Sequence, residues 1–178
     1  MNSIQSGEAR NLREGFGMRR ILEAVSLAAL AVLAWVTWSA LAGPARLPSR
    51  IPTHFNLAGK PDGWGTPEML LGLPVVAAVL YVLITWVSRH PSAFNFPVRV
   101  TPANRPRLER VALNMTAWLK AEMLCLLASI QTAIVESARR GRGELPAALM
   151  PAALVVVFGT IGWHIVAMRR AARPRATA

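Results

Sequence analysis

Four long apolar stretches, separated by polar connections, predict the secondary structure of this chain. They cover residues 21–42, 67–88, 112–136 and 146–168. A helix of about 20 mostly apolar residues crosses a bilayer core about 30 Å thick, and each stretch has about that length. The connections are too short for a separate soluble domain with its own core. The pattern therefore predicts an all-α fold: an integral membrane four-helix bundle forming one domain over residues 19–170.

The segments around these stretches have other patterns. Residues 1–18 are polar and lack apolar periodicity, which favours a disordered leader, and residues 171–178 form a short basic tail. The first connection, residues 43–66, is rich in proline and glycine, which favour extended segments and tight turns over helix. Residues 51–56 are expected to be extended and residues 60–63 to form a turn. We therefore expect a short irregular loop or hairpin outside the membrane.

Composition supports the membrane class and argues against another. Hydrophobic residues make up 53% of the chain, whereas soluble domains reach roughly 45–50% even with glycine counted. The net charge of +11 could suggest nucleic-acid binding, which requires basic residues gathered on one accessible face. Here the basic residues lie beside the ends of the apolar stretches. The expected partner is therefore the lipid bilayer, and no nucleic-acid partner is predicted.

The basic residues also predict the orientation of the chain, because Lys and Arg near the ends of spans are retained in the cytoplasm. Thirteen lie on one side: Arg10, Arg13, Arg19, Arg20, Arg89, Arg99, Arg105, Arg107, Arg110, Arg169, Arg170, Arg173 and Arg175. Six lie on the other: Arg46, Arg50, Lys60, Arg139, Arg140 and Arg142. Both termini are therefore expected in the cytoplasm. Tryptophan, which prefers the headgroup level, agrees at the inner ends (Trp86, Trp118, Trp163) and in the outer half of the first helix (Trp35, Trp38).

The first apolar stretch has an alternative interpretation. Basic residues, an apolar run and the small residues Ala40-Leu41-Ala42 resemble a secretory signal peptide with its cleavage site. The apolar run is about 20 residues long, however, and a signal peptide usually has 7 to 15 in this region. We favour an uncleaved membrane anchor. Cleavage would remove one helix without inverting the others.

The third apolar stretch differs from the others because it contains several polar and ionisable residues. At 100° per residue, six of them share one stripe about 80° wide: Asn114, Glu122, Cys125, Ser129, Thr132 and Glu136. Lys120 lies on a different face, and we expect its side chain to reach the cytoplasmic edge of the membrane. Thr101 or Asn104 is expected to cap this helix.

Glu122 is the most informative member of this stripe. A charge at the bilayer centre costs about 2.5 to 3.5 kcal/mol, so this side chain should face protein or water, or be protonated. One interpretation makes Glu122 an intramembrane proton or cation site. The other, which we favour, makes it a packing group that hydrogen-bonds to neighbouring helices.

Other candidate chemistry is sparse. His54 and Asp62 could share a proton or bind a metal, but a zinc site needs three or four ligands. The single Cys125 is expected to be a small buried side chain. The sequence thus predicts no catalytic residues, no metal and no cofactor.

The first connection also carries a recognisable pattern. Leu47-Pro48, Ile51-Pro52-Thr53-His54-Phe55-Asn56, Gly59, Pro61-Asp62 and Trp64-Gly65 follow one another in an order and spacing that resembles the bacterial membrane family of domain of unknown function 1648. Asn95-Phe96-Pro97-Val98 and Trp118-Leu119-Lys120 resemble the second half of its small members. The resemblance implies a bacterial cytoplasmic (inner) membrane protein. Its characteristic surface would be formed by His54, Phe55, Asn56, Gly59, Pro61, Asp62 and Trp64.

The same domain occurs in larger immunity proteins of a sporulation-delaying toxin system, and the family supplies no catalytic residues. Three hypotheses follow. The first is a non-enzymatic module whose outer loop senses or binds a ligand or toxin peptide, or docks a protein partner. The second is a small transporter that uses Glu122, and the third is a membrane enzyme built around His54 and Asp62. For His54, Asn56 and Asp62, structural and recognition roles are equally favoured.

Overall fold

A computed structural model describes residues 2–43, 47–56, 58–141 and 144–173, with side chains from residue 15 onward. Its elements follow in the order α1 (Asn2–Ala42), β1 (Ile51–Phe55), β2 (Pro61–Gly65), the 3-10 helix η1 (Pro67–Leu71), α2 (Gly72–Ser88), the 3-10 helix η2 (Pro91–Ala93), α3 (Arg105–Arg140) and α4 (Leu149–Ala172).

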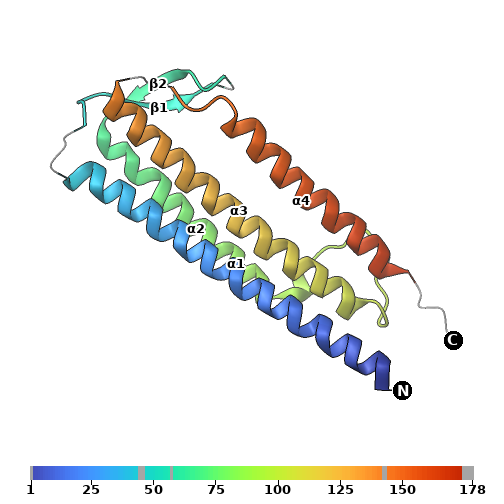
Figure 1. Cartoon of the computed structure of the whole chain (residues 1–178). Helices are drawn as coiled ribbons and strands as arrows, with labels where there is room; N and C mark the ends of the chain where they lie inside the picture. Colours follow the sequence, from blue (N-terminus) through green and yellow to red (C-terminus); the bar gives the residue numbers. More distant parts are fainter. Residues whose placement is uncertain (1, 44–46, 57, 142–143, 174–178) are drawn as a thin grey trace.

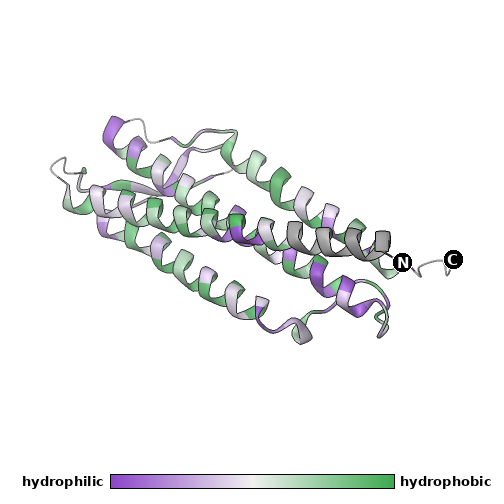
Figure 2. Ribbon diagram, turned by 60° about the horizontal axis from the view of Figure 1, so that its bottom comes forward, coloured by the Kyte–Doolittle hydropathy of each residue, from purple (hydrophilic) through white to green (hydrophobic). Residues whose placement is uncertain are grey.

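The described residues form a multi-pass membrane bundle, as the apolar pattern predicts. Four of their helical segments are long and apolar enough to cross a bilayer: Gly15–Ala42, Pro67–Ser88, Arg105–Arg140 and Leu149–Ala172. The two strands lie at one end of the bundle, and the start of α1 and the end of α4 lie at the other (Figure 1). Hydrophilic residues are concentrated at the ends of the helices and in the connections (Figure 2).

The first helix is longer than the sequence predicts. α1 begins at Asn2 and so includes the segment for which a disordered leader is expected; that segment contains no proline and has several good helix formers. α3 begins at Arg105 with Asn104 in the N-cap position, one of the two positions predicted, although the Asn104 side chain makes no capping hydrogen bond. Asn104 fixes the turn that precedes α3, because its Oδ1 accepts from Thr101 N at 2.8 Å and its Nδ2 donates to Arg99 O at 3.0 Å.

The expected hairpin is present, but its turn lies earlier than predicted. β1 and β2 pair in an antiparallel register that joins Ile51 to Gly65 and Phe55 to Pro61. Two backbone hydrogen bonds close the reversal of the chain: Asn56 N donates to Lys60 O at 2.9 Å, and Gly59 N donates to Asn56 O at 2.9 Å. Residues 61–63, expected in the turn, belong to β2. The Asn56 side chain explains this difference, because it accepts hydrogen bonds from the backbone of the turn and so favours a reversal directly after Asn56.

α3 lies between α1 and α4 (Figure 1) and contributes to every cluster of the core. At the hairpin end, Ile134, Val135 and Ala138 pack with Ile51 and Leu70. In the middle, α3 packs against α1 and α2, and at the opposite end it packs against α4 through Met168. The buried residues of α4 are His164 and Met168, both near its C-terminal end. α4 therefore buries side chains near its C-terminal end, whereas α1 is packed along most of its described length.

A buried polar residue fixes the hairpin end of this core. Gln131 is fully buried, and its Nε2 donates to Thr37 Oγ1 at 2.8 Å and to Leu70 O at 2.9 Å. These hydrogen bonds join α3 to α1 and to η1. Because membrane helices gain little from hydrophobic association, such interhelical bonds select one arrangement of the helices.

Candidate functional site

The hairpin is attached firmly to the end of the bundle. Ile51 of β1 is completely buried among residues of α3 and η1. Gly59 accepts a hydrogen bond at 2.9 Å from the backbone N–H of Leu145, in the connection between α3 and α4. Gly59 has φ +75, and a Cβ there would lie 2.6 Å from the carbonyl oxygen of Leu145. This conformation and close approach require glycine, so Gly59 has a structural role.

Three more residues of the family pattern hold the hairpin in shape. Asn56 Oδ1 accepts from Ala58 N at 2.9 Å and from Lys60 N at 3.1 Å, an arrangement that closes the turn. Phe55 is partly buried and packs against the core cluster of the hairpin end, and Pro61 is its partner across the strands. For Asn56, the hydrogen bonds give direct support to the structural role that the sequence leaves open.

The remaining residues of the pattern are exposed. His54 Nδ1 lies 2.5 Å from Asp62 Oδ1, across the two strands, and their side chains are 75% and 45% exposed. Trp64 is 52% exposed and, two residues after Asp62, lies on the same face of β2. The structure thus brings an imidazole, a carboxylate and an indole together on a rigid support. Within the described residues, no group of three His, Cys, Asp or Glu side chains could hold a metal ion.

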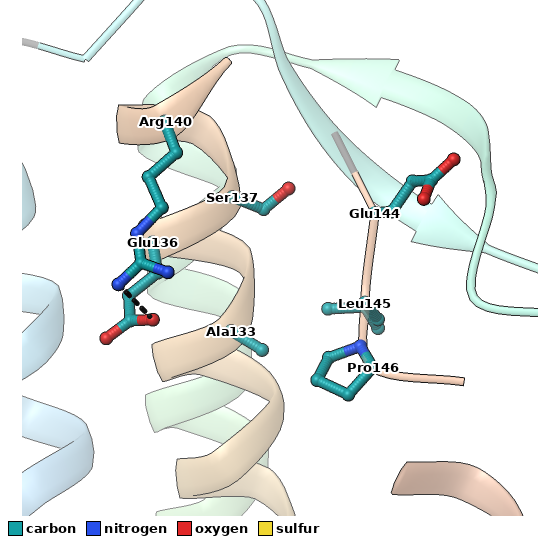
Figure 3. A pocket seen from close by; sticks show the side chains of 7 residues that line it. All are labelled: Ala133, Glu136, Ser137, Arg140, Glu144, Leu145 and Pro146. Carbon is teal, nitrogen blue, oxygen red and sulfur yellow. Dashed lines mark ion pairs between the residues drawn. The ribbon is translucent and has the colours of Figure 1, made fainter. Parts of the chain in front are cut away.

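A polar cleft of about 310 Å³ lies beside the hairpin, between the last turns of α3 and residues 144–146 (Figure 3). Arg140 on its rim pairs with Glu136 at 3.3 Å. Ser137 is buried, and its Oγ has no hydrogen-bond partner among the described residues. Leu145 lines the cleft and also binds Gly59, so the hairpin and the cleft share one wall.

Inside the membrane-spanning part, Lys120 forms the most extensive polar contacts. Its Nζ donates to Glu23 Oε2 at 2.5 Å and to Thr85 Oγ1 at 3.1 Å, and it lies 4.7 Å from the centre of the Tyr81 ring. The Lys120 side chain is 6% exposed. The ammonium group is therefore paired with polar groups of α1 and α2 within the bundle, and the proximity of Lys120 to the cytoplasmic edge of the membrane stays a prediction.

Glu23 completes this network. Its Oε1 accepts from the Tyr81 hydroxyl at 2.5 Å, so both carboxylate oxygens are bound by other helices. Glu23, Tyr81 and Thr85 are not among the residues predicted from the sequence. The sequence does contain an indication of this pair. Glu23 is an acidic residue within the first apolar stretch, and a buried lysine requires a partner of opposite charge.

Glu122 lies elsewhere, on the face of α3 toward α4. Its Oε1 accepts from Thr160 Oγ1 at 2.5 Å, and its Oε2 is buried without a hydrogen-bond partner in the described part of the chain. Asn114 lines a separate opening of about 490 Å³ between α3 and α4, with Thr160 and His164. Lys120 and Glu122 do not contact each other, as their positions on the helix predict, and neither joins the exposed residues of the hairpin.

The network should behave as a unit. Glu23→Gln should destabilise the protein by about 3 kcal/mol, because it leaves the buried ammonium group of Lys120 unpaired, and Lys120→Met should cost less, because the Glu23 side chain is 40% exposed. The double variant should recover much of this loss. Apparent melting temperatures of purified protein in lipid nanodiscs would measure both effects.

Glu109→Gln is the matched control for this prediction. It removes the more exposed Glu109–Arg105 pair of α3, whose atoms are 2.8 Å apart, and should cost less than about 1 kcal/mol. Equal effects of the two kinds of variant would contradict a special role for the network.

The fold and hairpin define a class: a four-helix multi-pass membrane protein with a rigid two-stranded hairpin between its first two spans. Residues 27–78 match the family model described as Domain of unknown function (DUF1648). The match covers the second half of α1, the hairpin and the first part of α2, and confirms the resemblance predicted for this part of the chain.

One relative matches a limited part of the chain. An uncharacterized protein of the archaeon Archaeoglobus fulgidus is 34% identical over 73 residues, covering 36% of this chain and 40% of the relative. The chain thus spans about two fifths of that relative's length. No solved structure matches the chain.

Proposed function

We propose that this protein is a non-enzymatic membrane module that binds a peptide or protein partner through its hairpin. The observation that supports this is the contrast within the hairpin. Ile51, Asn56 and Gly59 fix its shape, while His54, Asp62 and Trp64 remain exposed. Exposed aromatic and charged groups on a rigid support lose little entropy on binding and can contribute strongly to it.

The family match favours the same part of the molecule. It includes the hairpin but ends before α3, so it contains neither Lys120 nor Glu122. The polar cleft beside the hairpin extends the surface that a partner could contact, with Glu136, Arg140 and Glu144 on its rim (Figure 3). Sensing of a ligand and immunity to a toxin peptide are both specific forms of this proposed role.

Binding by the hairpin can be tested in living cells with a photo-crosslinking amino acid in place of Trp64. We expect a covalent adduct with a partner, and we expect His54→Ala or Asp62→Ala to reduce its yield about tenfold, because charge-assisted contacts contribute about 1.5–3 kcal/mol. Immunoblotting followed by mass spectrometry measures yield and identity.

Two controls accompany this experiment. The same crosslinker at Val155, which is 73% exposed on α4, should not form this adduct. Gly59→Ala should abolish it by distorting the hairpin. An adduct that forms equally well without His54 and Asp62 would refute their role in binding.

We further propose that the protein resides in the cytoplasmic membrane of a bacterium with the hairpin outside and both termini in the cytoplasm. The excess of arginine at the end of the bundle that carries the termini supports this orientation.

Reporter fusions test the orientation directly. Alkaline phosphatase, which is active only outside the cytoplasm, should be active when fused at residue 55 and inactive when fused at residue 103. Green fluorescent protein at the same positions should give the opposite pattern. Activity of the phosphatase at residue 103 would overturn the proposed orientation.

A small transporter that uses Glu122 is the second candidate function, favoured by the unpartnered Oε2 atom of this residue. In that case, Glu122→Gln should abolish proton-coupled flux in reconstituted vesicles while leaving expression normal. The structurally similar change Glu136→Gln, at an exposed ion pair, should leave flux intact. Flux that survives Glu122→Gln would exclude this mechanism.

A further inference from the structure

A long cleft lies on the outer surface of α3, between α1 and α4. Its main part has a volume of about 480 Å³ and is lined by α1 from Met18 to Val25, by α3 from Trp118 to Ser129, and by the first half of α4. A second part of about 360 Å³ shares Ser129 and Leu149 with it and continues toward Glu136. The cleft exists because α4 packs on α3 mainly near the C-terminal end of α4.

The floor of this cleft is the polar stripe that the sequence predicts on the third helix. Cys125, expected to be buried, is exposed there. The Ser129 hydroxyl is satisfied, since it donates to the backbone oxygen of Cys125 at 2.8 Å. Glu122 is different, because Oε2 has no hydrogen-bond partner among the described residues. None of the described residues that line the 480 Å³ part is basic.

The comparison with Glu23 shows what Glu122 lacks. Both carboxylates lie within membrane-spanning helices, and both accept a hydrogen bond from a hydroxyl group at 2.5 Å. Glu23 also has the ammonium group of Lys120 as its counter-charge. Glu122 has an apolar cleft in the corresponding place. An ionised carboxylate in such surroundings is strongly stabilised by a cation that contacts its free oxygen.

We infer that this cleft binds a lipophilic cation: a protonated amine attached to an apolar chain or compact apolar body. The ammonium group would pair with the Glu122 carboxylate after a rotation of this side chain that brings the buried Oε2 to the cleft, and the apolar part would lie along Cys125, Ala153 and Val156. The volume falls within the range of about 300–1,000 Å³ typical of small-molecule sites, which are mostly apolar with a few polar groups that fix orientation.

A lipid acyl chain is the competing occupant, and charge separates the two. A neutral chain would fill the same apolar volume without using Glu122. A protonated amine would depend on this residue and would bind better than a neutral molecule of equal length. The 480 Å³ part that contains Glu122 shares no lining residue with the cleft beside the hairpin, so the inference does not depend on the proposed binding of a partner there.

The probe is a dodecylamine that carries a photoactivatable diazirine in its chain, added to the full-length protein in phosphatidylcholine nanodiscs. Mass spectrometry should find adducts on residues that line the cleft in α3 and α4. Unlabelled dodecylamine should suppress them at a concentration at least tenfold lower than 1-dodecanol. Glu122→Gln should reduce the labelling at least tenfold.

Two further variants separate binding from general damage. Glu109→Gln changes an acidic residue of α3 that does not line either part of the cleft and should leave the labelling unchanged. Val156→Trp keeps Glu122 but fills the cleft, and should abolish the labelling. Labelling that persists in Glu122→Gln, or equal competition by dodecanol, would overturn the inference and identify the cleft as an ordinary groove for lipid chains.

Discussion

The ammonium group of Lys120 lies inside a bundle that crosses a membrane, and the arrangement of three helices follows from satisfying its charge. Glu23 of α1 supplies the opposite charge, while Tyr81 and Thr85 of α2 supply an aromatic face and a hydroxyl. Lipid cannot replace these groups, so α1 and α2 must meet α3 at one level and in one rotation. Gln131, farther along α3, imposes a similar requirement at the hairpin end.

This fixed frame explains why so short a hairpin can be rigid. A two-stranded hairpin is at best marginally stable alone in water. Here Ile51 packs into the end of the frame, and Leu145 forms a backbone hydrogen bond to the hairpin turn at Gly59. The bundle therefore stabilises the hairpin, and the side chains of His54, Asp62 and Trp64 remain available on its exposed face.

α4 is outside this frame for most of its length. It contributes no buried ion pair among the described residues, and its contact with Glu122 is one hydroxyl group of Thr160. The result is an opening over the polar stripe of α3. Glu122 lines this opening, and its Oε2 is buried without a hydrogen-bond partner among the described residues. The two faces of α3 thus differ in packing: one holds the frame together, and the other faces the cleft for which we propose a lipophilic cation as ligand.

The sequence by itself determined the four membrane spans, the hairpin between the first two and the family pattern that it carries, because these depend on local composition and on turn-forming residues. It also placed Lys120 and Glu122 on different faces of one helix. It could not determine that Lys120 is buried with Glu23, since these residues are far apart in the chain and their contact depends on how three helices pack. Nor could it place Cys125 in an open cleft. Helical periodicity gives the direction of a side chain, but the position of the neighbouring helix decides whether that direction leads into protein, into a cleft or toward lipid.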